Sequence, residues 1–147
     1  MAKSSVFRTF GTSRQLEREG IWLNYGDIKF LVARAGGTNI AYQELLKAKI
    51  RPVRHQIERD TLSKDDDNRI NAELYAETII KDVQVLQEDG QWVKGVPTEA
   101  GDVAPYSTAA VVALLLELPE LFRDLRTCAS DSQKYLKEQE AADTKNS

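Results

Sequence analysis

The sequence predicts an α+β fold that is mainly α, with an N-terminal antiparallel β-hairpin packed on a helical body that ends in two or three C-terminal helices. Short alternating stretches near the start, helical spacing of apolar residues elsewhere, and a proline within the most apolar region predict this class. We expect a loosely ordered N-terminus over residues 1–13, one globular domain over residues 14–137, and a polar, frayed tail over residues 138–147.

The predicted hairpin spans residues 16–34. Apolar and polar side chains alternate over residues 21–24 and again over residues 28–33, which is typical of half-buried strands. The sequence NYGD between them supplies the Asn, Gly and Asp that a tight turn favours.

The middle of the chain contains a Gly-Gly pair and a strong helix start. Gly36 and Gly37 precede Thr38 and Asn39 without the spacing of a phosphate-binding loop, so we interpret them as a turn before a capped helix. That helix is expected to stop or kink before Pro52, where a second short helix can begin.

Ser63 then predicts a helix that runs to about Lys81. Three aspartates, Asp65 to Asp67, lie in its first turn, where their negative charges stabilise the positive end of the helix dipole. A calcium loop is the alternative, but its glycine and distal glutamate are missing. The following residues, 83–103, are turn-rich, and Asp89-Gly90 predicts a small hairpin or an ordered loop.

The C-terminal region is expected to form two helices that meet at Pro119. Every residue from Ala109 to Leu116 is apolar, so the first helix is predicted to be buried all round. The second is amphipathic, because apolar residues recur at helical spacing on one side. This region supplies the candidate partner-binding residues, with the protein's own core as the alternative use of the same face: Leu114, Leu118, Leu121, Phe122 and Leu125.

Charge is unevenly distributed along the chain. The net charge is −3, but residues 1–54 carry +6 and residues 55–147 carry −9. This polarity favours either attraction between the two halves within one fold or head-to-tail contacts between subunits. The basic half lacks an aromatic series and a nucleic-acid module, and no apolar run approaches a membrane span, so we expect neither nucleic acid nor membrane as a partner.

The residues needed for catalysis are not clustered in the sequence. His55 is the only histidine, and it lies among arginines without a second metal ligand. Cys128 is the only cysteine, which excludes an internal disulfide and is typical of a reducing compartment. We therefore expect no enzyme activity, no metal and no cofactor, although carboxylate-pair hydrolysis by distant residues stays open.

Three stretches resemble the tail assembly chaperones of long-tailed, siphovirus-type bacteriophages. They are EGIWLNYGDIKFLVARAGGTNIAYQELL, AELYAETIIKDVQVLQEDGQWVKG and PYSTAAVVALLLELPELFRDLRTCASDSQKYLKEQE. The most specific parts are the Ala-Arg-Ala-Gly-Gly-x-Asn junction at residues 33–39 and the Leu-Pro-Glu-Leu-Phe block at residues 118–122. The chain departs from the family at residues 108–110, where Thr-Ala-Ala replaces an acidic helix start.

The resemblance implies a non-enzymatic factor for virion and tail assembly in the host cell cytoplasm. Such a chaperone binds the helical tape measure protein, keeps it soluble, helps recruit tail-tube protein, and is absent from the mature virion. Self-association is a further option, and a longer form made by ribosomal frameshifting is common in the family. The alternatives are a structural tail or head-tail connector protein retained in the virion, and an unrelated small binding domain that pairs through its C-terminal helices.

Overall fold

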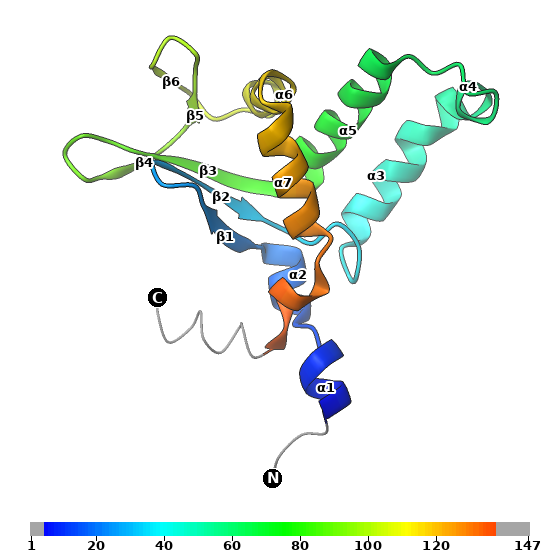
Figure 1. Ribbon diagram of the computed structural model, residues 1–147, viewed down its shortest axis with the longest axis horizontal. Coiled ribbons are helices and arrows are strands. Elements are labelled where there is room, and N and C mark those ends of the chain that lie inside the picture. The colour runs from blue at the N-terminus through cyan, green and yellow to red at the C-terminus, as the bar shows by residue number, and fades with distance from the viewer. Residues whose placement is uncertain (1–4, 138–147) are drawn as a thin grey trace.

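The structure, a computed structural model, describes residues 5–137 of the chain (Figure 1). The tail predicted over residues 138–147, and the first four residues of the predicted loose N-terminus, lie outside the described residues. The helical elements are α1 (Ser5–Phe10), α2 (Arg14–Glu19), α3 (Ile40–Ile50), η1 (Arg51–Val53), α4 (Arg54–Glu58), α5 (Lys64–Thr78), α6 (Thr108–Glu117), α7 (Pro119–Ala129) and η2 (Ser132–Tyr135). The strands are β1 (Ile21–Asn24), β2 (Ile28–Val32), β3 (Ile80–Leu86), β4 (Trp92–Lys94), β5 (Val96–Pro97) and β6 (Val103–Ala104). A mixed, mainly helical class is confirmed.

The main sheet is antiparallel and has the order β1-β2-β3-β4. β1 pairs with β2 in the register Leu23 to Phe30, and β2 continues to β3 with Phe30 opposite Val83. The hairpin predicted over residues 16–34 is wrong at its start, because residues 16–19 belong to α2, and its two strands, β1 and β2, are half of a larger sheet. β5 and β6 form a second, two-stranded sheet beside it.

The expected helix end at Lys81 is wrong. α5 ends at Thr78, and β3 begins at Ile80, where the backbone pairs with Val32 of β2. The Thr78 hydroxyl donates to the carbonyl of Leu74, which is a competing local hydrogen bond at the helix end. Two consecutive isoleucines follow, and β-branched side chains of this kind favour a buried strand. The start of α5 is as predicted, because the Ser63 hydroxyl accepts from the backbone N–H of Asp66 at 3.1 Å.

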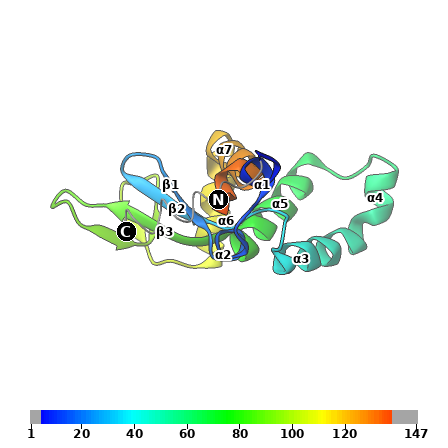
Figure 2. The same cartoon turned by 90° about the horizontal axis from the view of Figure 1, so that it is seen from below.

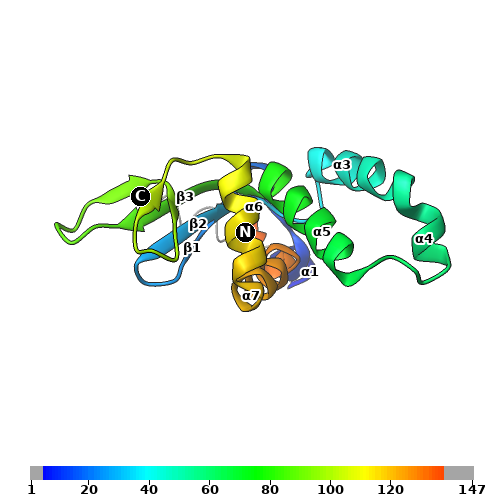
Figure 3. The same cartoon turned by 90° about the horizontal axis from the view of Figure 1, so that it is seen from above.

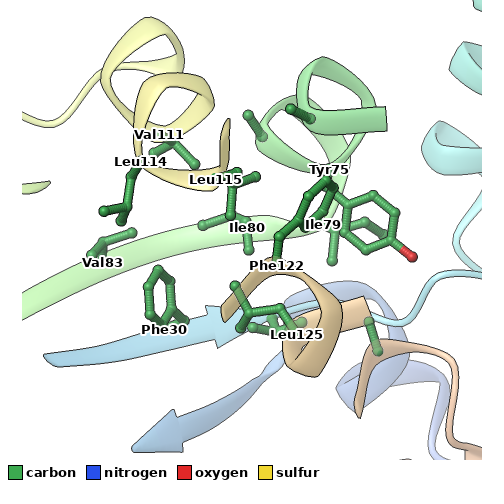
Figure 4. Packing of buried hydrophobic residues seen from close by; sticks show 14 of the residues in the cluster. Phe30, Tyr75, Ile79, Ile80, Val83, Val111, Leu114, Leu115, Phe122 and Leu125 are labelled. Carbon is green, nitrogen blue, oxygen red and sulfur yellow. The ribbon is translucent and has the colours of Figure 1, made fainter. Parts of the chain in front are cut away.

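One face of the sheet packs on α5, α6 and α7 (Figure 4). Phe30 and Val83 of the sheet lie opposite Leu115 and Leu125 of the helices, and all four are almost completely buried. Tyr75 and Phe122 meet edge to face, with ring centroids 5.3 Å apart. The core is therefore a layer between the sheet and the three helices.

α6 and α7 meet at Pro119, as predicted. Leu118 is not helical, with φ −121° and ψ 75°, and Pro119 occupies the first position of α7, where a missing N–H costs no helix hydrogen bond. The prediction that α6 is buried all round is wrong, because Ala113 and Leu116 are exposed. A uniformly apolar sequence has no period that distinguishes the buried face from the exposed one.

A buried carboxylate explains the Gly-Gly pair. The side chain of Glu17, 1% exposed, forms an ion pair with Arg34 and accepts a hydrogen bond from the Thr38 hydroxyl at 3.0 Å. Gly37 has φ +54°, and a Cβ on it would lie 1.9 Å from a Glu17 carboxylate oxygen. Asn39 then caps α3 by accepting from the backbone N–H of Tyr42. Glycine is therefore required where the chain passes over the carboxylate.

α3, η1 and α4 form an arm that extends away from the sheet (Figures 2 and 3). We call residues 40–59 the basic arm. None of the residues in its three helical elements is buried. The arm rests on α5 through the Lys49–Glu73 ion pair at 2.5 Å and an edge-to-face contact of Tyr42 with Tyr75.

Candidate functional site

The structure separates the five candidate partner-binding residues into core and surface. Leu125 is fully buried, and Leu114 and Phe122 are each 8% exposed. Leu121 is half-buried and packs against the same core, whereas Leu118 is 46% exposed. Most of the apolar face of α7 thus contributes to the protein's own core, and Leu118 is the member of the set that is well placed to meet another molecule.

Leu118 lies at the end of a groove between α6 and the β5–β6 sheet. The groove has a volume of about 600 Å³, which is in the range of pockets that take a drug-sized ligand or a few side chains. Apolar residues form most of its wall. The lining residues are Val96, Pro97, Thr98, Glu99, Ala104, Ala110, Ala113, Leu114, Glu117 and Leu118.

Small side chains on α6 create this groove. Ala110 and Ala113 present only methyl groups, so the helix leaves room between itself and the β5–β6 sheet. The Ser107 hydroxyl caps the helix by accepting from the N–H of Ala110 at 3.0 Å. The Tyr106 hydroxyl hydrogen bonds to the Ile80 carbonyl at 3.4 Å, which ties the segment before α6 to β3. These two hydrogen bonds fix the α6 wall of the groove.

The groove has an acidic rim. Glu99 lies in the β5–β6 turn and Glu117 lies at the end of α6, and both are exposed. The residues that line the groove include no Lys or Arg. An apolar floor with carboxylates at its edge suits an apolar segment flanked by basic side chains.

A second hollow, on the other side of α6, has the opposite charge. It lies between α5, α6 and α7, has a volume of about 560 Å³, and is lined by Lys64, Arg123 and Arg126 over the apolar side chains of Leu116 and Phe122. The Arg126 guanidinium lies 5.4 Å from the ring centroid of Phe122, a cation–π contact. Leu116 and Leu118 are therefore both exposed but border different surfaces.

The outer face of the sheet carries an aromatic pair. The Nζ atom of Lys29 lies 4.8 Å from the ring centroid of Trp22 and 4.5 Å from that of Trp92. Trp22 is 44% exposed. The Lys29 ammonium thus makes a cation–π contact with each ring, and these contacts connect β2 to β1 and to β4.

Burial is the main cause of the shifted pKa values of Cys128 and Tyr25. Burial is the main cause that raises the pKa of the Cys128 thiol, and a raised pKa keeps the thiol in its less nucleophilic form. Burial also raises the pKa of Tyr25, whose hydroxyl donates to Asp124 at 2.5 Å. His55 is exposed on α4, and within residues 5–137 no cluster of three His, Cys, Asp or Glu residues is arranged to hold a metal.

Sequence reasoning did not find the groove. It selected α6 and α7 for their large apolar residues, but the walls come from alanines and from the short β5–β6 sheet. A usable signal was present in the small residues at 110 and 113, three positions apart on one helix face. The partner strands contain only two residues each, which is too short for a periodic pattern.

Comparisons with known proteins identify a family. The model of the family described as YdaY prophage protein matches residues 36–146, which is more than half of the chain. The chain therefore belongs to this family and derives from a bacteriophage. No curated protein matches the chain, and no solved structure does. In the part of the chain from Ser5 to Lys137, no helix has the length and apolar character needed to cross a membrane.

Proposed function

We propose that this member of the YdaY prophage protein family is a tail assembly chaperone without enzyme activity. It binds the tape measure protein in the host cell cytoplasm, keeps it soluble, helps recruit tail-tube protein, and is absent from the mature virion. The groove between α6 and the β5–β6 sheet is the observation that carries this proposal. The phage origin of the family and the sequence resemblance to tail assembly chaperones support it.

The groove suits a helical partner. A helix presents side chains three and four positions apart along one face, and such a face can be held in an apolar groove. Leu118 at one end, Leu114 on the floor and Val96 on the opposite wall provide apolar contacts. The rim carboxylates of Glu99 and Glu117 would pair with basic residues that flank the apolar face of the partner.

A pair of leucine variants tests the groove. Leu118→Asp places a charge at the groove, whereas Leu116→Asp places the same charge two residues earlier, on α6 but outside the groove. The two leucines are 46% and 41% exposed, so both variants are expected to fold. In co-expression with the tape measure protein, Leu118→Asp should lose the soluble complex and Leu116→Asp should retain it. Equal behaviour of the two variants, with unchanged melting curves, would contradict the use of the groove.

The competing function is a structural tail or head-tail connector protein. Mass spectrometry of purified virions separates the two, because a chaperone should be missing from the particle and a structural protein should be present in stoichiometric amounts. Gene order provides an independent check: a chaperone gene is expected between a tail-tube gene and a very long tape measure gene. Detection of the protein at the level of the tail-tube subunits would refute the chaperone proposal.

A further inference from the structure

The basic arm extends from the body of the molecule with its charge largely unpaired. Residues 40–59 contain five Lys or Arg residues and two Glu. Among the ion pairs within residues 5–137, only Lys49–Glu73 joins a residue of the positive first 54 to a residue of the negative remainder. The charge asymmetry of the sequence is therefore not neutralised within the fold.

The arm also carries aliphatic side chains that the fold does not bury. Ile40 and Ile57 are 57% and 42% exposed, and Leu45, Leu46 and Ile50 are each only half-buried. Most of the stability of a helix in a protein comes from burying one of its faces. The helices of the arm bury little of their apolar surface, so that surface is free to pack on another molecule. Exposed apolar residues beside unpaired cations mark a surface that fits an acidic partner with apolar residues of its own.

The opposite end of the same molecule has these complementary properties. Along the long axis of the molecule, α4 lies at one end, and the β1–β2, β3–β4 and β5–β6 turns lie toward the other end (Figures 1 and 3). None of the three turns contains Lys or Arg. Leu86 and Val93, which flank the β3–β4 turn, are 36% and 38% exposed. The exposed carboxylates of this acidic end are Asp27, Glu88, Asp89, Glu99 and Asp102.

We infer that the basic arm of one copy docks on the acidic end of a second copy. The two surfaces face opposite directions on one chain, so they cannot meet within a molecule, and the contact between copies is head-to-tail. Ile57 would meet Leu86 and Val93, and the arginines of the arm would meet the turn carboxylates. Such a contact leaves one free surface at each end, so it propagates into a ring or a filament. The inference does not require a tape measure protein, although the β5–β6 turn with Glu99 borders both the groove and the acidic end.

Two double variants test the contact from its two sides. Arg54→Glu with Arg59→Glu reverses two of the five basic side chains of the arm, and Glu88→Lys with Asp89→Lys reverses two of the five exposed carboxylates of the acidic end. All four side chains are exposed, so folding should be unchanged by circular dichroism. Arg14→Glu with Arg18→Glu on α2 is the matched control for the arm variant, because it makes the same charge change on exposed residues outside both surfaces.

Light scattering after size exclusion gives the readout. At low salt the native protein and the control should have masses above one chain, and both should return to one chain near 1 M salt, where the screening length falls to about 3 Å. Each reversed variant should remain a single chain. A mixture of the two reversed variants should form complexes, because the intact arm of one variant can meet the intact acidic end of the other.

Three outcomes would overturn the inference. The first is native protein that remains a single chain at low salt. The second is loss of association in the α2 control to the same degree as in the arm variant. The third is a mixture of reversed variants that stays as single chains. If a labelled oligonucleotide binds the native arm while the protein stays a single chain, the surface belongs to a nucleic-acid partner and the self-association proposal is refuted.

Discussion

Replacing Leu125 by alanine distinguishes core from partner surface on the face that the sequence selected. Leu125 projects from α7 toward the sheet and is fully buried, so truncation to alanine removes buried side-chain atoms and leaves a cavity. Buried Leu→Ala changes cost about 2–5 kcal/mol, of which the cavity contributes about 24 cal/mol per Å³. Leu118 is 46% exposed, so about half of the roughly 2 kcal/mol available from burying a leucine is at stake there. We expect a loss of about 3 kcal/mol for Leu125→Ala and about 1 kcal/mol for Leu118→Ala.

Urea denaturation followed by circular dichroism measures both losses, provided that the slope of the transition stays constant across the variants. The thermal midpoint of Leu125→Ala should fall by about 10 °C, since 1 kcal/mol corresponds to about 2–4 °C in a domain slightly larger than this one. Equal losses for the two variants, or a Leu125→Ala loss below about 0.5 kcal/mol, would refute the packing of α7 described above.

Two further predictions concern the polar junction and the buried tyrosine. Gly37→Ala should destabilise the protein more than Gly36→Ala, because both glycines have positive φ but only the Cβ at Gly37 would meet the Glu17 carboxylate; comparison of their melting curves checks this. The free energy of unfolding should fall as the pH rises above about 10, the ordinary pKa of an unfolded tyrosine, because burial raises the pKa of Tyr135 in the folded state and the unfolded chain releases its proton first. Tyr135→Phe should reduce this pH dependence at the cost of the hydrogen bond to the Val32 carbonyl, and an unchanged alkaline slope would contradict the assignment.

Local signals in the sequence predicted the boundaries that depend on a single residue. Ser63 starts α5 and Pro119 starts α7, because a capping hydroxyl and a ring without an N–H act on their immediate neighbours. The end of α5 was not predictable in this way. Ile79 and Ile80 fit either the buried face of a helix or a strand, and the pairing of β3 with a strand nearly fifty residues earlier decides between them.

The candidate site was predicted only in part, for a related reason. The sequence indicates which residues are apolar, but it does not show how much apolar surface the fold uses internally. Phe122 and Leu125 are buried in the core. The groove is shaped instead by Ala110 and Ala113, which are not large enough to be selected for their hydrophobicity. The buried Glu17 was missed because its partners, Arg34 and Thr38, are distant in the sequence and become neighbours only through the turn at Gly37.

Asn39 has a consequence for how the arm moves. Its side chain donates to the carbonyls of Arg34 and Thr78 and accepts at the start of α3, so the base of the arm is held at three points. Beyond that base, the arm lacks buried residues, and segments with little burial open locally at lower free energy than the core. Amide protons of α3 and α4 should therefore exchange through local opening, independently of global unfolding, while those of β2 and β3 remain protected. We therefore expect the arm to open and close about the base that Asn39 holds.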